Sequence, residues 1–165
     1  MGRSGENMIW LSRVLLLLAF GLFWGGLTFY TGFVVRITHD VLADPFDGGL
    51  ITQRVTEVLQ MLGIVTLVLM ALNGVMVTRC FPKYGYALLA CALLLGVSLT
   101  GLFVVHNHLD TIIDIAAGEI TDRDRFVVGH RRYNQLTTVE WLATLVYLPI
   151  TVFAWRSIDA RVTKP

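Results

Sequence analysis

The stretch YALLACALLLGVSLTGLFVV, residues 86–105, decides the fold class of this chain. It contains no charged side chain and shows none of the apolar–polar alternation that is typical of a half-buried strand. About 20 such residues in an α-helix reach about 30 Å, which is the thickness of the hydrocarbon core of a bilayer. The stretch therefore predicts a transmembrane helix.

Three further runs have similar length and composition, at residues 10–35, 55–78 and 136–155. The first run is longer than the apolar core of a signal peptide, so we expect it to be retained as a span and to continue helically to about Leu42. Hydrophobic residues make up 55% of the chain and charged residues 15%, against about 25% charged in soluble domains. The sequence predicts an all-α fold, an integral membrane four-helix transmembrane bundle that forms a single domain over residues 1–165.

The charges give a weak orientation and exclude one class of partner. The short segment between the second and third runs carries Arg79 and Lys83 and the tail is basic, which favours a cytoplasmic location for both termini. Ten of the twelve acids lie on the opposite side of this arrangement, so the outer end is expected to be acidic. A net charge of +1 excludes a nucleic-acid role. We expect a bacterial-type inner membrane or plasma membrane protein.

Histidines gather at the predicted outer end. They are His39, His106, His108 and His130. If the third helix continues past the membrane, His106, Asp110 and Asp114 share one of its faces, because they are spaced by four residues. His108 would face about 200° away. We expect a loop from Asp110 to Gly129 before the fourth helix.

Two acidic residues lie deeper in the predicted spans. Glu57 stands about one turn into the second span and Glu140 near the start of the fourth. A carboxylate in hydrocarbon costs on the order of 3 kcal/mol, so each should face the bundle interior and find a partner. The candidate basic partners are Arg36, Arg54, Arg131 and Arg132. Each acid is interpreted as an ion-pair member at a helix entrance or as a ligand or proton acceptor beneath the histidines.

Imidazole and carboxylate groups together are suited to Cu, Zn, Fe or Mn, or to haem. The preferred hypothesis is therefore a transition metal or haem site at the outer end. Its candidate ligands are His39, His106, His108, His130, Asp110, Glu57 and Glu140. An alternative interpretation of the same residues is an interfacial polar network.

Two other functions remain open on sequence grounds. One is a membrane scaffold or accessory subunit that docks a protein partner through its acidic outer face. The other is a small-solute or proton carrier lined by Glu57, Asn73 and Glu140. The sequence has no HExxH, GxSxG or P-loop motif, so no particular enzyme class is indicated. Gly21, Gly25 and Gly32 form a small-residue stripe, which we expect to pack within the monomer, with dimerisation as the alternative.

Two segments resemble a known family. FWGGLTFYTGFVVRI, residues 23–37, with its W-G-G-x-x-F core, resembles the first span of the uncharacterised four-span membrane family that includes transmembrane protein 205. RFVVGHRRYNQLTTVEWLATL, residues 125–145, is similar to the F-x-x-x-H-x-x-Y/S segment of that family, in which His130 takes the place of the family histidine. Glu140 falls near a family position that is often Asn.

This resemblance implies a compact four-helix membrane domain without an inherited activity. A more distant similarity reaches four-span histidine-bearing membrane proteins of the copper-resistance CopD type and the HemJ-type protoporphyrinogen oxidase. Those proteins handle a metal or a porphyrin, so the distant similarity implies the same chemistry as the metal or haem hypothesis.

Overall fold

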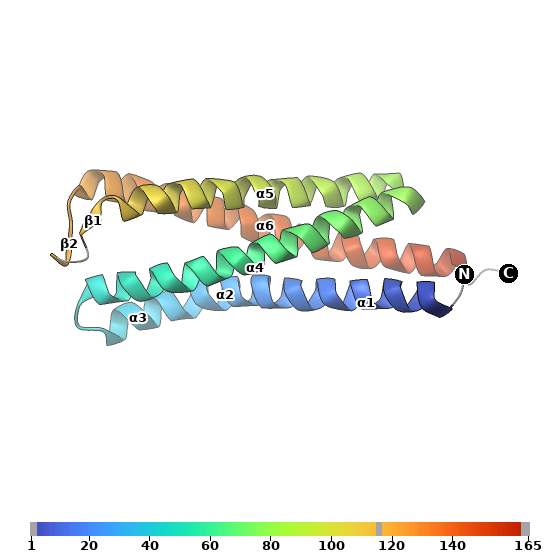
Figure 1. Cartoon of the computed structure of the whole chain (residues 1–165), viewed down its shortest axis with the longest axis horizontal. Helices are drawn as coiled ribbons and strands as arrows, with labels where there is room; N and C mark the ends of the chain where they lie inside the picture. The colour runs from blue at the N-terminus through green and yellow to red at the C-terminus, as the bar shows by residue number, and fades with distance from the viewer. Residues whose placement is uncertain (1–2, 115–116, 163–165) are drawn as a thin grey trace.

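The structure is a computed structural model that describes residues 3–114 and 117–162. Four long helical segments run alternately up and down, and both termini lie at the same end of the bundle (Figure 1). The first segment consists of α1 (Arg3–Phe20), η1 (Gly21–Gly25), α2 (Gly26–Phe29), η2 (Tyr30–Val34) and α3 (Val35–Val41), where η1 and η2 are π-helical. The rest consists of α4 (Pro45–Cys80), α5 (Pro82–Asp110), β1 (Ile113–Asp114), β2 (Glu119–Ile120) and α6 (Arg123–Val162).

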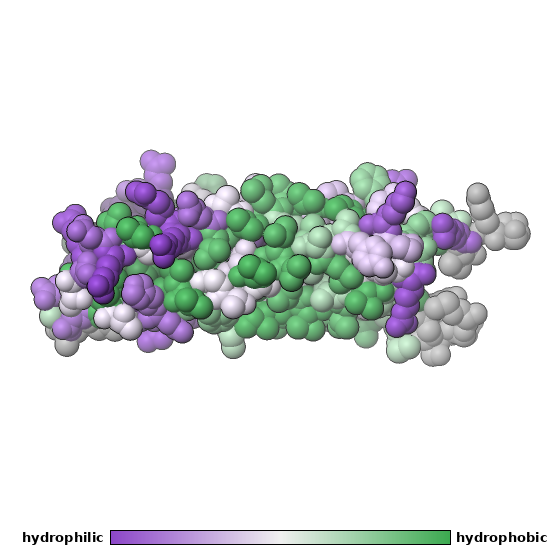
Figure 2. All heavy atoms as spheres, turned by 90° about the horizontal axis from the view of Figure 1, so that it is seen from above, coloured by the Kyte–Doolittle hydropathy of each residue, from purple (hydrophilic) through white to green (hydrophobic). Residues whose placement is uncertain are grey.

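All four segments are long and apolar enough to cross a membrane, which confirms the predicted all-α, four-helix membrane fold. Large apolar side chains cover the outside of the bundle, including Leu18, Leu22, Phe29 and Leu93, each more than half exposed. Figure 2 shows this surface as a hydrophobic belt between two more hydrophilic ends. Such a surface requires lipid around it, because an aqueous monomer rarely exposes so large an apolar area. The structure therefore indicates an integral membrane protein.

The helix boundaries follow from local chemistry. Asp44 caps α4 by accepting a hydrogen bond from the Phe46 amide at 2.8 Å, with Pro45 as the first helical residue. Between α4 and α5 only Phe81 is non-helical. Gly85 lies inside α5, where an added β-carbon would clash with Thr78. The residue allows two helices to approach closely.

The connection after α5 is shorter than expected. α6 begins at Arg123, so the predicted loop to Gly129 is helical over its last part. β1 and β2 form a small antiparallel ladder in which Asp114 faces Glu119. The expectation that Asp114 shares a helix face with His106 is therefore wrong, because α5 ends at Asp110. We call the end of the bundle that holds this ladder and the α3–α4 turn the polar end, and the opposite end the terminal end.

The helices pack unevenly around α5, and this creates space at the polar end. α5 packs against both α4 and α6, and α1 packs against α4. The first segment meets α6 at η1, where the Trp24 and Trp141 rings stack at 5.7 Å. The Trp141 indole N–H also donates to the Thr28 hydroxyl at 2.9 Å. These aromatic contacts join the first and last segments below the polar end.

Glycines contribute to packing at positions that the sequence did not single out. A β-carbon at Gly63 would lie 2.9 Å from the Leu99 side chain and 3.0 Å from Phe23, so Gly63 lets three segments meet. The stripe of Gly21, Gly25 and Gly32 has no such neighbour within 4 Å. The expectation that this stripe packs within the monomer is therefore wrong.

Candidate functional site

A cavity of about 1000 Å³ lies among all four segments in the polar half of the bundle. The lining residues farthest from the polar end are Phe23 on the first segment, Gln60 on α4, Leu102 on α5 and Glu140 on α6. We call these four residues the inner end of the cavity. Asp44, Glu119 and Arg123 line its other end, next to the α3–α4 turn and the ladder. The polar-end cavity thus runs from charged surface residues into the apolar interior.

The inner end contains two buried polar side chains. Gln60 is 4% exposed and Glu140 is 2% exposed. Both amide atoms of Gln60 and the Oε1 atom of Glu140 have no hydrogen-bond partner among the described residues. Buried polar groups are nearly always paired, because an unpaired one costs about 1–3 kcal/mol. Two such groups from different helices on one cavity indicate that a bound molecule or water completes their hydrogen bonds.

Two tyrosines also line the cavity. The Tyr30 hydroxyl donates to the Thr52 carbonyl at 3.0 Å, so this ring is fixed against α4. Tyr133, on α6, is half-buried and lies close to Thr56, Gln60 and Glu140. Its hydroxyl can donate to or accept from a molecule at the inner end. The walls around it are apolar and include Leu27 and Leu59.

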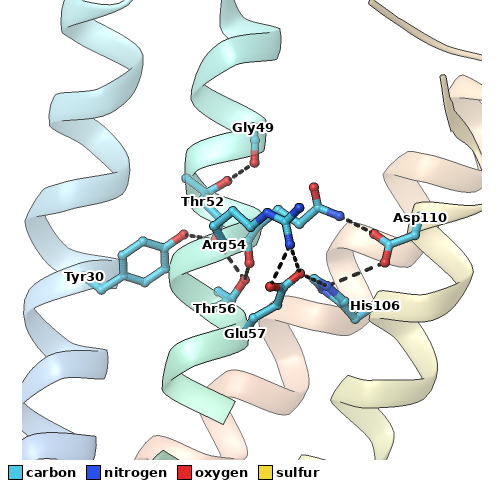
Figure 3. Close-up of polar contacts among 9 residues, drawn as sticks. Tyr30, Gly49, Thr52, Arg54, Thr56, Glu57, His106 and Asp110 are labelled. Carbon is cyan, nitrogen blue, oxygen red and sulfur yellow. Dashed lines mark hydrogen bonds and ion pairs between the residues drawn. The ribbon is translucent and has the colours of Figure 1, made fainter. Parts of the chain in front are cut away.

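A second polar group joins side chains of α4 and α5 (Figure 3). It consists of Gln53, Arg54, Glu57, His106 and Asp110, and we call it the mouth cluster. Arg54 pairs with Glu57 at 3.1 Å, and Gln53 donates to Asp110 at 2.7 Å. The His106 Nε2 atom lies 3.8 Å from Glu57 and 3.7 Å from Asp110. Of the four predicted basic partners, Arg54 is therefore the one that pairs with Glu57.

Glu140 does not have the basic partner that the sequence led us to expect. None of the ion pairs among residues 3–114 and 117–162 includes Glu140. Arg131 and Arg132 are on the same helix but are exposed, and Arg36 lies 4.0 Å from Asp40. The carboxyl group of Glu140 is therefore the single acid at the inner end and faces apolar or neutral groups.

The histidines lie on three helices, α3, α5 and α6, which all reach the polar end, and three of them, His39, His106 and His130, line the cavity. Their side chains nevertheless form no metal-binding group within the described structure. His39 is exposed and lies next to Gly48. His130 is exposed and stacks on Phe126 at 5.9 Å. His106 belongs to the mouth cluster, with 12% of its side chain exposed. His108 is exposed and lies outside the set of described residues that line the cavity.

The described part of the chain holds no group of three His, Cys, Asp or Glu side chains that could bind one metal ion. Binding of a metal or haem by the predicted ligands stays a prediction.

Asn73, predicted to line an internal path, instead donates to the Tyr147 hydroxyl at 2.8 Å and accepts from the Trp155 indole at 2.9 Å. Of the three residues predicted to line a solute path, Glu140 lines the cavity, whereas Glu57 belongs to the mouth cluster and Asn73 bonds to Tyr147 and Trp155.

The sequence reasoning did not single out Gln60, Tyr30 or Tyr133 as site residues. Gln60 carries a usable signal, since it is a polar residue followed by the apolar stretch MLGIV, residues 61–65. An uncharged polar side chain at this depth should face the bundle interior and find a partner. The tyrosines carry no comparable signal, because aromatic residues are common in membrane spans for other reasons.

Comparisons with family models, with curated proteins and with solved structures found no match to this chain. The resemblance to the family of transmembrane protein 205 stays a prediction.

Proposed function

We propose that this membrane protein binds a small amphipathic solute in the polar-end cavity. The observation that carries this proposal is the pair of buried, unpartnered side chains, Gln60 and Glu140, on the same cavity. Ligand pockets typically have volumes of about 300–1,000 Å³ and apolar walls with a few convergent polar groups. The volume of about 1000 Å³ and the lining of this cavity fit that description.

The other candidate functions have less geometric support. A scaffold that docks a partner through its outer face would not need polar groups buried far below that face. A metal site would need converging ligands, and although His39, His106 and His130 line the cavity, no group of three His, Cys, Asp or Glu side chains that could hold one ion occurs among the described residues. The solute hypothesis also differs from a complete transport path, because the Trp24–Trp141 stack joins two segments near the inner end.

The proposal can be tested by filling the cavity. Thr137 lines the cavity and Thr138 is exposed outside it, while each donates to the carbonyl four residues earlier in α6. Thr137→Trp should block the cavity, and Thr138→Trp is the matched control. The probes are three adamantane cages that carry an amine, a hydroxyl or a carboxylate. Binding to the purified full chain in lipid nanodiscs is measured by titration calorimetry, with empty nanodiscs subtracted.

At least one probe should bind saturably with one-to-one stoichiometry. Its affinity should fall by about tenfold or more in Thr137→Trp, since a tenfold loss corresponds to about 1.4 kcal/mol, and stay within about twofold in Thr138→Trp. The proposal is wrong if no probe binds, or if the two variants weaken binding equally.

A further inference from the structure

We infer that the solute of the polar-end cavity is a cation, a protonated amine on an apolar body, with Glu140 as its counter-charge. This inference rests on the proposed function and adds the chemical class of the ligand. Glu140 is 2% exposed, and its carboxyl group has no basic partner among the ion pairs of the described residues. A buried carboxylate without a partner is costly, and a bound cation would remove that cost.

The neighbours of Glu140 suit an ammonium group. A primary ammonium group has three donors and no acceptor. Glu140 Oε1 and Gln60 Oε1 are buried oxygen atoms without partners in the described structure, and both can accept from such a group. Tyr133, close to both, offers a third oxygen and an aromatic ring face. Aromatic rings attract cations through their negative faces, more strongly when water is excluded.

The rest of the inner end selects the body of the ligand. Phe23 and Leu102 belong to the inner end, and Leu27 and Leu59 line the same cavity. These side chains offer no hydrogen bonds, so they favour a compact apolar group next to the ammonium head. A strongly hydrated small cation such as Na⁺ would gain little from them, because it requires several oxygen ligands around it. The geometry therefore favours an amphipathic amine.

The surface around the cavity entrance is acidic and therefore attracts positively charged ligands. The parts of the chain that lead to and from the polar end hold ten of the twelve acids, from Asp40 to Glu140. They hold only six of the thirteen basic residues, namely Arg36, Arg54, Arg123, Arg125, Arg131 and Arg132. Asp44, Asp110 and Glu119 line the cavity there, together with Arg123. An excess of acidic groups raises the local concentration of cations and speeds their association.

The test compares ligands that differ only in charge. 1-Aminoadamantane is cationic at pH 7, whereas 1-hydroxyadamantane is neutral and 1-adamantanecarboxylate is anionic, all on the same cage. In the wild-type full chain in nanodiscs, we expect the amine to bind between about tenfold and about a hundredfold more tightly than the alcohol, as for a hydrogen bond to a charged group. The carboxylate should bind more weakly than the alcohol. This comparison needs no variant, so it does not depend on the folding of one.

Glu140→Gln keeps the shape of the side chain and removes its charge. It should lower amine affinity at least about tenfold and leave alcohol affinity within about threefold. Asp159→Asn, at the terminal end, also removes one acid but should leave both affinities unchanged. Equal binding of amine and alcohol to the wild type, or undiminished amine binding in Glu140→Gln, would overturn the cation inference while leaving cavity binding in place. Absence of binding by all three cages would overturn the proposed function itself.

Discussion

Buried polar side chains differ in their hydrogen bonding between the two halves of the bundle. In the terminal half, Asn73 donates to Tyr147 and accepts from Trp155, and the Tyr147 hydroxyl donates to the Met70 carbonyl at 3.0 Å. We call these groups the terminal-half network. In the polar half, Gln60 and Glu140 have unpartnered atoms within the described structure. Buried polar side chains thus join helices in the terminal half, whereas in the polar half they have atoms that are able to bind a ligand.

One residue departs from this division. The Thr151 hydroxyl is buried in the terminal half and has no hydrogen-bond partner among the residues described. It does not line the polar-end cavity. The contrast between the halves therefore rests on Asn73, Gln60 and Glu140, whose side chains are large enough to bridge helices or to reach a ligand. Three pairs of substitutions, each with one member in either half, compare the packing, the buried polar groups and the surface charges of the two halves.

The largest expected effect comes from adding one methyl group in each half. Gly85→Ala should lower the free energy of unfolding by about 2–3 kcal/mol, because its β-carbon would clash with Thr78 where α4 and α5 meet. Gly49→Ala, in α4 at the polar end, meets nothing within 4 Å. It should raise the free energy of unfolding by up to about 1 kcal/mol through helix propensity. Equilibrium unfolding in mixed micelles measures both, and equal effects would contradict the uneven packing.

A smaller effect is expected from replacing one polar side chain in each half by leucine. Asn73→Leu should cost about 2 kcal/mol, because it leaves the Trp155 indole N–H without its acceptor. Gln60→Leu should be neutral or stabilise the fold by up to about 1 kcal/mol, since it removes polar atoms that have no partner in the described structure. The same unfolding measurement applies. A cost for Gln60→Leu equal to that of Asn73→Leu would mean that Gln60 has a structural partner.

The smallest effect is expected at the surface ion pairs of the two ends. Arg13 binds both carboxylate oxygens of Asp159 at 2.9 Å and lies over the Trp155 ring, while Glu57 pairs with Arg54 at 3.1 Å. Asp159→Asn should cost about 0.5–1 kcal/mol and Glu57→Gln about 0.5 kcal/mol or less, as for exposed pairs. Salt screens such pairs, so both costs should shrink when ionic strength rises from about 0.01 M to about 1 M. A cost independent of salt would indicate packing in place of charge.

Particular residues explain how far the sequence could lead to the site. Glu140 was recognised as a deep acid because an ionisable residue in an apolar run stands out against its neighbours. Its predicted pairing with an arginine did not follow, since Arg131 and Arg132 are exposed on the same helix. The histidines were predicted at one end from chain direction alone. Whether His39 and His130 approach each other depends on helix rotation, about which residue spacing within one helix says nothing.

The four apolar helices and their up-and-down order can be predicted from the amino-acid sequence. Both follow from the length of the apolar runs and from the cost of leaving backbone polar groups unpaired in lipid. Which side chains share the polar-end cavity depends on how the helices pack against one another. Gln60 and Glu140 belong to helices that both pack against the first segment, through the close approach of Phe23 to Gly63 and through the Trp24–Trp141 stack. Periodicity fixes the face of each helix, whereas packing between helices fixes which faces meet and where a space remains.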